Sequence, residues 1–283
     1  MFWICLICGI VIVLIAALGY CIAPGKLTPD ARKTAKGFYG LNCAHRGLHT
    51  KDRIVPENSL PAFAAARSGG YGIELDVRLS KDEQVVVFHD DDLKRVCGVD
   101  KPVDDMTWEE LSGLRLFDTA ERIPLFTEAL EAIADTPVIV EIKSAGANNE
   151  ILCQKTLELL HGAGQNWCVE SFDPRVVAWF RKHAPDILRG QLSCLPESYD
   201  SLAKLTTFAL GNLLTNFISR PHFISYSDEP HPLTVRLCRV MKPVNVVWTL
   251  NPESDITKCE KENDVVIFEH YTPPQRFKGE LRV

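Results

Sequence analysis

The stretch Gly72-Ile73-Glu74-Leu75-Asp76-Val77-Arg78-Leu79 lies between Gly69-Gly70 and Ser80-Lys81-Asp82. An apolar residue stands on each side of both acids, and side chains in a strand alternate between two faces, so Glu74 and Asp76 are expected to share one face. Two carboxylates on a buried face repel each other and lose hydration, so they need a cation or a strong donor between them. The other interpretation is a solvent-exposed edge strand with an acidic outer face. The residues at neighbouring strand ends favour the buried interpretation.

Strand-like and helix-like segments alternate from Phe38 onward. The candidate strands cover residues 41–44, 72–79, 85–88, 137–142, 167–172, 187–192, 223–226, 244–250 and 264–268. Such alternation over about 240 residues is typical of a parallel α/β domain, and the length suits a closed (β/α)8 TIM barrel. There are nine candidate strands, whereas such a barrel has eight, so one candidate is expected to be a short extra strand or a misassignment. A doubly wound sheet is the alternative, but the Gly-rich phosphate turn after the first strand is absent because Gly47 stands alone.

Residues 1–23 are predicted to form an uncleaved transmembrane anchor. They carry no charged side chain and are long enough to cross a hydrocarbon core. A cleaved signal peptide is disfavoured, because no basic residue begins the chain and no clear small-residue cleavage site ends the run. The basic residues that follow outnumber the single Asp30, which predicts that the C-terminal bulk is cytoplasmic; they are Lys26, Arg32, Lys33 and Lys36.

The rest of the chain is predicted to be a linker at 24–37 and one catalytic domain at 38–283. A polar, irregular insertion is expected at about 91–119, with one short helix from Trp108 to Leu114 that Thr107 can cap. Earlier, either Asn58 or Ser59 can cap the Ala-rich helix that has Pro61 in its first turn. The net charge of −6 gives no reason to expect nucleic acid as a partner. Three of the ten cysteines lie in the predicted anchor and the other seven lack paired spacing, which fits a reducing compartment.

Polar residues that suit phosphate chemistry gather at the ends of the first strand-like runs. In chain order they are His45 and Arg46, Glu74 and Asp76, His89 and Asp90, and Glu141 and Lys143. In a TIM barrel the C-terminal strand ends meet at one mouth, where the active site is built. The three acids Glu74, Asp76 and Glu141 suit a hard divalent ion such as Mg²⁺ or Ca²⁺. Cations beside a metal point to an anionic ligand, so Arg46 and Lys143 indicate a phosphate group.

The two histidines can divide the proton transfers of phosphodiester cleavage. One takes the proton from the attacking oxygen and the other gives a proton to the leaving oxygen, since imidazole titrates near neutral pH. In isolation, His45 could instead be a strand-end histidine that bonds the backbone, and Glu141 with Lys143 could be a surface ion pair. Asp90 and the two aspartates after it are interpreted as a solvated turn, not a second metal site.

Five motifs in this order resemble the glycerophosphodiester phosphodiesterase family. They are His45-Arg46-Gly47, Pro56-Glu57-Asn58-Ser59 with Phe63, Glu74-Leu75-Asp76-Val77, His89-Asp90 and Glu141-Ile142-Lys143. The resemblance runs from about Leu41 to Pro273. It implies a TIM barrel, a divalent metal, and hydrolysis of glycerophosphodiesters to sn-glycerol 3-phosphate and an alcohol. It also implies that His45 and His89 are the acid/base pair, that Glu74, Asp76 and Glu141 are metal ligands, that Arg46 and Lys143 contact phosphate, and that Glu57 supports the metal site.

Two later motifs match the family less closely. Phe172, after Glu170-Ser171, resembles a pocket-lining aromatic, and Trp248 resembles a tryptophan that packs over the substrate glycerol, although it could equally be a core residue. The last strand departs from the family's Thr-Asp-x-Pro, because Phe268-Glu269-His270-Tyr271 stands there. His270 could contact a head group, but a solvated loop histidine is the simpler interpretation.

Three functions follow as hypotheses. The first is a membrane-anchored, metal-dependent glycerophosphodiester phosphodiesterase at the cytoplasmic face. The second is a phospholipase D-like or phosphatidylinositol phospholipase C-like activity on lysolipids or membrane lipids. The third is a scaffold that binds a phosphate ligand without catalysis, against which the intact histidine pair and acid triplet argue.

Overall fold

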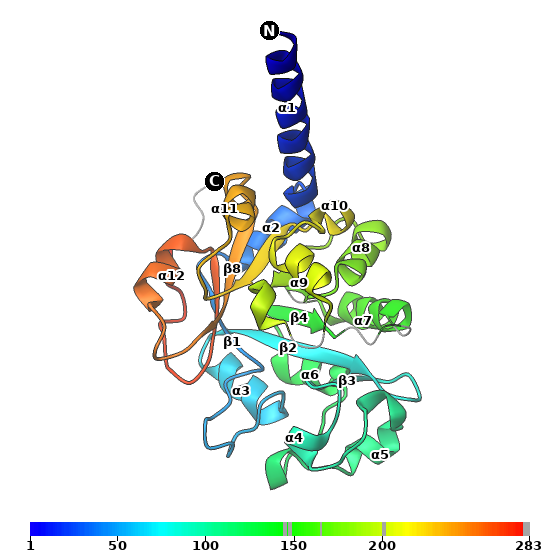
Figure 1. The fold of residues 1–283 in the computed structure, drawn as a ribbon. Helices are drawn as coiled ribbons and strands as arrows, with labels where there is room; N and C mark the ends of the chain where they lie inside the picture. Colours follow the sequence, from blue (N-terminus) through cyan, green and yellow to red (C-terminus); the bar gives the residue numbers. More distant parts are fainter. Residues whose placement is uncertain (144–145, 147–148, 165, 200–201, 280–283) are drawn as a thin grey trace.

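Eight parallel strands close into a barrel in the computed structural model, which describes residues 1–143, 146, 149–164, 166–199 and 202–279 (Figure 1). The first strand pairs with both the second and the last, which closes the sheet. The strands are β1 (Asn42–Ala44), β2 (Gly72–Leu79), β4 (Val138–Ile142), β5 (Trp167–Ser171), β6 (Arg189–Ser193), β7 (Phe223–Ser227), β8 (Val244–Leu250) and β9 (Val265–Phe268). The TIM barrel predicted from the alternating segments is confirmed.

The ninth candidate strand is an extra strand outside the parallel barrel. β3 (Val85–Val87) runs antiparallel to β2, with Val77 opposite Val87. A turn joins them, in which Ser80 N donates to the carbonyl of Gln84 at 2.9 Å. Phe88 N then donates to Asp76 O at 3.1 Å, so the chain returns to the level of the acidic pair. His89 therefore reaches the barrel mouth at the end of a hairpin, and the prediction that it ends a barrel strand is wrong.

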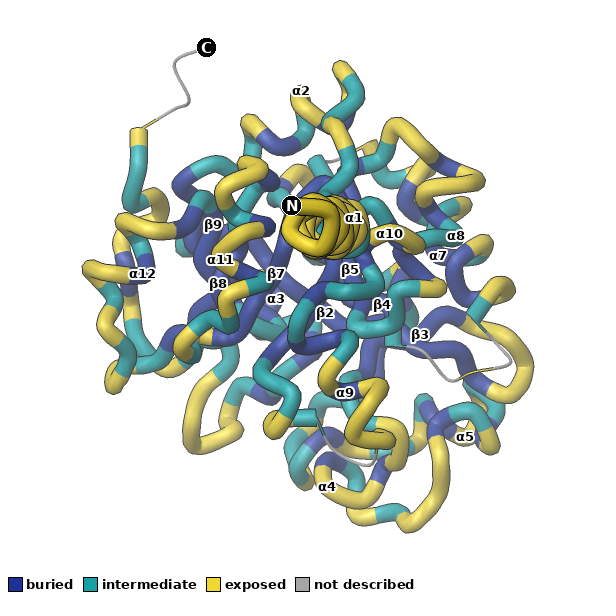
Figure 2. The backbone as a smooth tube through the Cα atoms, turned by 45° about the horizontal axis from the view of Figure 1, so that its top comes forward, coloured by how far each residue is buried: buried dark blue, intermediate teal, exposed yellow. Residues whose placement is uncertain are grey.

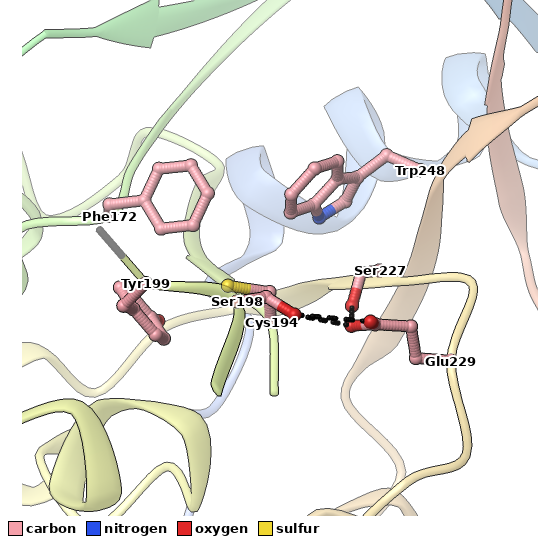
Figure 3. Close-up of a pocket in the computed structure, with 7 residues that line it drawn as sticks. All are labelled: Phe172, Cys194, Ser198, Tyr199, Ser227, Glu229 and Trp248. Carbon is pink, nitrogen blue, oxygen red and sulfur yellow. Dashed lines mark hydrogen bonds between the residues drawn. The ribbon is translucent and has the colours of Figure 1, made fainter. Parts of the chain in front are cut away.

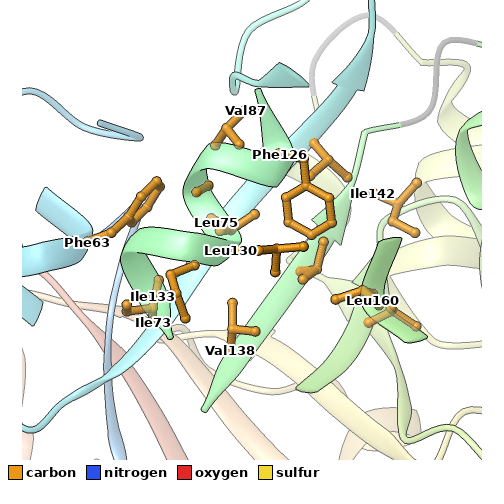
Figure 4. Close-up of a cluster of buried hydrophobic side chains, with 14 of the residues drawn as sticks. Phe63, Ile73, Leu75, Val87, Phe126, Leu130, Ile133, Val138, Ile142 and Leu160 are labelled. Carbon is orange, nitrogen blue, oxygen red and sulfur yellow. The ribbon is translucent and has the colours of Figure 1, made fainter. Parts of the chain in front are cut away.

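The side chains of β2 alternate as the sequence predicted. Ile73, Leu75 and Val77 pack in a large apolar layer between barrel and helices, while Glu74 and Asp76 point to the other face and are buried. Figure 4 shows this layer, in which Phe126 and Leu130 cover β2 and β4. Each such side chain contributes roughly 1.5–3 kcal/mol when fully buried. The solvent-exposed edge strand is therefore excluded for residues 72–79.

Helices surround the barrel on its outer side. They are α3 (Leu60–Ser68), α6 (Phe126–Ile133), α7 (Asn149–Ala163), α8 (Pro174–His183), α10 (Asn216–Ser219), α11 (Leu233–Val240) and α12 (Ile256–Glu262). Ser59 caps α3 by accepting a bond from Ala62 N, and Pro61 lies in the first turn, which settles which of the two candidate residues is the cap. The segment between β6 and β7, difficult to interpret from sequence, contains η4 (Pro196–Ser198), α9 (Lys204–Gly211) and α10.

The insertion after β3 has a small core of its own. It contains α4 (Lys94–Cys97), η1 (Val103–Asp105), α5 (Trp108–Ser112) and η2 (Leu116–Asp118). Apolar side chains such as Phe88, Leu93 and Leu111 are buried together within it. Thr107 caps α5 in a capping box with Glu110, as its position predicted. The expectation of a mostly irregular insertion needs correction, because scattered apolar residues between short turns give little periodic signal.

The segment predicted as a linker contains a helix, α2 (Pro29–Phe38). Thr28 caps it and Pro29 begins it. Ala31, Ala35 and Phe38 are buried with residues at the starts of the barrel strands, such as Phe223, so α2 covers the end of the barrel opposite the mouth. The sequence shows only about one heptad of pattern here, which is too short to distinguish a helix from a basic linker.

The N-terminal helix α1 (Phe2–Ile22) projects from the barrel and is exposed along most of its length (Figure 2). Its 21 residues have a mean hydropathy of 2.9 in the most apolar window, which is long and apolar enough to cross a membrane, as either an anchor or a signal sequence would. Its last turn is attached to the barrel wall. Ile22 is buried beside Ile224, and Arg220 donates to the carbonyl oxygens of Tyr20 and Ala23.

Candidate active site

Three buried carboxylates meet inside the barrel mouth. Glu74 and Asp76 come from β2 and Glu141 from β4, and Asp76 and Glu141 are direct neighbours across the sheet. One oxygen from each lies within 4.8 Å of the others. Their exposed fractions are 2%, 1% and 6%. Such a set of hard oxygen donors fits a divalent ion such as Mg²⁺ or Ca²⁺.

The pKa values of these acids show the effect of crowding. Burial, then the charges of Asp76 and Glu141, raise the pKa of Glu74 well above its usual range. Burial also opposes ionisation of Asp76, but Lys143, His89 and Arg46 outweigh it and lower the pKa of Asp76 well below its usual range. Asp76 is therefore the more readily ionised of these two acids, whereas Glu74 resists ionisation, and a cation held between them would favour the charged form of both.

Lys143 and Arg46 supply the compensation that the sequence predicted. Lys143 Nζ lies 2.7 Å from Glu141 Oε1 and 3.0 Å from Asp76 Oδ1. Arg46 Nε lies 3.5 Å from Asp76 Oδ2, and Arg46 N donates to Glu74 Oε2 at 2.9 Å. Burial would lower the pKa of Lys143, but Asp76 and Glu141 raise it, so the ammonium stays charged. Both cations are thus placed beside an anion that a metal ion held by the three acids would attract.

A chain of ion pairs connects Arg46 to His89. Arg46 Nη1 lies 2.7 Å from Glu57 Oε1, Glu57 also binds Arg95, and Arg95 binds Asp90. Asp90 Oδ1 then accepts a 2.6 Å hydrogen bond from His89 Nδ1. The interpretation of Asp90 as a solvated turn is wrong, because its carboxylate orients His89. The adjacency of Asp90 to His89 was the available signal.

His45 is oriented by a residue from the other end of the domain. Its Nδ1 lies 2.8 Å from Oε2 of Glu269, and Glu269 is the residue directly after β9. Burial and the charge of Arg46 lower the pKa of His45 to about 4, while the hydrogen bond that His45 donates to Glu269 partly opposes this shift. The imidazole is therefore neutral near pH 7. Because Nδ1 donates to the carboxylate, Nε2 remains an acceptor.

Glu269 is the main site residue that the sequence interpretation missed. The departure from the family's last motif was visible, but which histidine it would contact was not. His49 and His270 lie beside it, with their ring centroids 4.9 Å apart and their Nε2 atoms each 3.8 Å from a Glu269 oxygen. His270 thus faces this carboxylate at the rim, and its side chain is 24% exposed.

Aromatic side chains line a pocket of about 430 Å³ beside the cluster. Figure 3 shows Phe172 and Trp248, which lie edge to face on its wall with ring centroids 5.6 Å apart. They follow or belong to β5 and β8, at the mouth end of the barrel. On its lower side, Ser227 and Ser198 donate to Glu229. Trp248 thus borders a pocket and also packs against the apolar interior.

A second cleft of about 1380 Å³ extends from the cluster toward α9 and α10. His89, Glu141 and Lys143 line its inner end, and Phe172 and Tyr199 border both this cleft and the aromatic pocket. Its volume exceeds the range of roughly 300–1,000 Å³ that is usual for small-ligand pockets. It therefore has room for more than a phosphate and a glycerol.

Comparison with known proteins agrees with this geometry. Residues 45–271 match the glycerophosphoryl diester phosphodiesterase family. The chain belongs to this family. A glycerophosphodiester phosphodiesterase from Caldanaerobacter subterraneus subsp. tengcongensis is 31% identical over 234 residues, which cover 78% of this chain and 90% of that relative.

Lysophospholipase D GDPD1 from Rattus norvegicus is 37% identical to this glycerophosphoryl diester phosphodiesterase family member over 136 residues. The match covers 44% of this chain and 41% of GDPD1, so the chain aligns with less than half of the length of that relative.

Solved structures of the glycerophosphoryl diester phosphodiesterase family share the fold. The glycerophosphodiester phosphodiesterase of Thermotoga maritima has a TM-score of 0.62 at 29% identity, and covers 81% of this chain and 93% of its own. A phosphodiesterase from Oleispira antarctica, solved with the product sn-glycerol-3-phosphate, has a TM-score of 0.68 at 24% identity and covers 85% of this chain and 96% of its own. The likeness to the second structure supports the barrel.

Proposed function

We propose that the chain hydrolyses glycerophosphodiesters to sn-glycerol 3-phosphate and an alcohol. The observation that carries the proposal is the buried cluster of Glu74, Asp76 and Glu141 with Lys143 bound to it. These acids would hold Mg²⁺ or Ca²⁺, which when bound would polarise the phosphoryl oxygens. Arg46 and Lys143 would stabilise the charge that develops on the phosphate.

His45 and His89 would perform the proton transfers. His45 is neutral near pH 7 and has Nε2 available, so it would take the proton from the attacking oxygen. His89, held by Asp90, would give a proton to the leaving alcohol. Glu57 would support the site by holding Arg46 and Arg95 in place. Phe172 and Trp248 would pack against the glycerol in the aromatic pocket.

The test is release of glycerol 3-phosphate from a panel of glycerophosphodiesters with Mg²⁺, Ca²⁺ or a chelator. Wild type is compared with His45→Ala and Glu74→Gln, and with Glu131→Gln on the exposed face of α6 as a matched control. Metal-dependent release that both site variants lose and the control keeps supports the proposal. Folded wild-type protein that binds these substrates without releasing product would indicate the non-catalytic scaffold instead.

The proposal includes the location of the enzyme. α1 would be a single-pass anchor, and the basic residues after it would hold the catalytic domain at the cytoplasmic face. A reporter fused after Val283 tests the orientation. Reporter activity on the outer side of the membrane only would reverse it.

A second candidate is phospholipase D-like action on lysolipids. The relative named lysophospholipase D GDPD1 and the apolar residues along the large cleft favour it. Parallel assays on glycerophosphocholine and lysophosphatidylcholine separate the two, because turnover of the lipid alone would displace the first proposal.

A further inference from the structure

Two histidines and one carboxylate meet at the rim of the barrel mouth and form a group that shares no member with the acidic cluster. His45 and His49 come from the segment after β1, and Glu269 directly follows β9. Ala44 pairs with Phe268 where the barrel closes, which brings the residues after these two strands together. One potential ligand atom from each of the three side chains lies within 4.8 Å of the other two.

The distances among these atoms suit a transition-metal ion. Nδ1 of His45 lies 2.8 Å from Oε2 of Glu269, and Nε2 of His49 lies 3.8 Å from the same oxygen. A tetrahedral zinc ion with ligands at about 2.0–2.2 Å holds its ligand atoms roughly 3.3–3.6 Å apart. The two observed distances lie on either side of this spacing. The three atoms are therefore close to a zinc coordination sphere, in which a water would take the fourth position.

His49 gives an independent indication of a ligand. Its side chain is only 10% exposed, yet its Nε2 has no hydrogen-bond partner among the residues that the structure describes. Nearly all buried polar atoms have a partner, and a missing one costs roughly 1–3 kcal/mol. His270 packs edge to face against the His49 ring, with centroids 4.9 Å apart, and so restricts its rotation. A metal ion beside Glu269 would supply the partner that this nitrogen lacks.

The ligand types distinguish this group from the acidic cluster. Imidazole nitrogens favour Zn²⁺ and its neighbours in the first transition row, whereas Mg²⁺ and Ca²⁺ prefer the oxygen donors of the cluster. Arg46 follows His45 in the chain, but its positive charge is compensated by ion pairs with Glu57 and Asp76. Repulsion between this guanidinium and an ion at the rim is therefore limited.

We propose that His45, His49 and Glu269 bind Zn²⁺ and that the bound ion inhibits the enzyme. The inhibition rests on the proposed function, in which Nε2 of His45 takes the proton from the attacking oxygen. In the zinc-free protein, Nδ1 of His45 carries the proton and donates to Glu269. Zinc binds the lone pair of Nδ1, so the proton moves through water to Nε2 and the imidazole stays neutral. Nε2 is then a donor and no longer a base.

The first test measures glycerol 3-phosphate release by the full chain in detergent, at saturating Mg²⁺ and increasing Zn²⁺. Each protein is compared with its own zinc-free rate. His49→Gln should raise the zinc concentration for half-inhibition by at least about tenfold, since loss of even a supporting partner of a metal ligand costs that much. His161→Gln, an exposed histidine on α7, is the matched control and should respond to zinc as wild type does. Inhibition that further Mg²⁺ relieves and that His49→Gln leaves unchanged would overturn the proposal, because it would place zinc on the acidic cluster.

The second test measures binding without turnover, with Co²⁺ in place of Zn²⁺. Cobalt absorbs visible light strongly in tetrahedral sites and weakly in octahedral ones, so the Mg²⁺-saturated wild type should develop intense bands. The midpoint of this titration should rise by at least about tenfold in His49→Gln and stay unchanged in His161→Gln. Equal midpoints in wild type and His49→Gln would refute the metal site. Intense cobalt bands in a wild type that shows no metal-dependent turnover would support the site and count against the proposed function alone.

Discussion

The imidazole of His45 depends on a carboxylate contributed more than two hundred residues later in the chain, since Glu269 Oε2 accepts its Nδ1–H. This bond fixes the ring tautomer. The carboxylate accepts a hydrogen bond from the nitrogen that carries the proton, so the proton stays on Nδ1 and Nε2 carries none. A residue directly after β9 therefore orients an imidazole directly after β1, the neighbouring strand in the closed barrel.

Glu269→Gln should lower kcat by roughly tenfold to a hundredfold, the usual effect of removing a supporting partner. Glu269 raises the pKa of His45, which lies at about 4, so its removal should lower that pKa further. In the proposed reaction neutral His45 accepts the proton, so the acid limb of the kcat/KM profile should move to lower pH. A pH profile of wild type and variant measures both effects. His270→Gln is the control at the same rim, and an unchanged rate and profile in Glu269→Gln would refute the positioning role.

The residues of the acidic cluster could be predicted from the sequence because their pattern is local. Period-two alternation places Glu74 and Asp76 on one face, and the mouth of a parallel barrel collects Glu141 and Lys143. The Glu269 contact could not be predicted, because it depends on the closing pair β1–β9 and on side-chain reach, neither of which has a local signature.

At the scale of elements, two adjacent residues in the loop before α3 have different structural roles. Ser59 caps the helix, while Asn58 Nδ2 donates to Asp76 Oδ2 at 2.8 Å. Asn58 has a φ of 52°, a left-handed conformation that asparagine tolerates better than most residues. The turn thus directs one side chain to the helix and the other to the cluster.

Ser59→Ala should destabilise the fold by about 1 kcal/mol, the usual loss for an N-cap, with little change in metal affinity. Asn58→Asp places a second carboxylate beside Asp76, and should therefore change metal affinity by about tenfold or more while α3 keeps its cap. Chemical unfolding and metal titration by calorimetry give the two readouts. Equal effects of both substitutions on metal affinity would show that capping of α3 by Ser59 and the contact of Asn58 with Asp76 are not independent.

Among the elements, sequence periodicity predicted the barrel strands well and the exceptions have physical reasons. A run of valines does not encode strand direction, so β3 was indistinguishable from a barrel strand until its pairing with β2 was known. α2 is too short for the spacing of its apolar residues to identify a helix from the sequence. Its burial against the barrel is what stabilises the helix.

At the scale of the whole molecule, the network around Glu57 links stability to pH. Burial opposes ionisation of Glu57, but hydrogen bonds and charge from Arg95 and Arg46 outweigh it and lower the pKa to about 2, from an ordinary 4.5. Between these values the folded protein holds fewer protons than the unfolded chain. The stabilisation is therefore complete above about pH 4.5 and is lost as pH falls toward 2.

This network should contribute up to about 3 kcal/mol at neutral pH. Urea unfolding of wild type and Glu57→Gln at pH 7 and at pH 3 measures it, and the difference between the two proteins should shrink at the lower pH. The variant is needed as a reference because buried Glu74 and Glu141 have raised pKa values. Their effect on the pH dependence of the unfolding free energy is opposite in sign to that of Glu57. A difference that grows on acidification would contradict the assignment. Exposed Glu131→Gln serves as the control, with no pH-dependent difference expected.

The hydrogen bonds between the last turn of α1 and Arg220 and Asn216 have a geometric consequence. A domain on a flexible linker could take many positions and orientations relative to a membrane surface, within the reach that the linker length allows. Here the helix end is fastened to the barrel wall, and α2 continues from it into the opposite end of the barrel. In a bilayer, the height and tilt of the catalytic mouth would therefore be set by the fold itself. Every copy of the domain would therefore present its mouth to the bilayer in the same orientation.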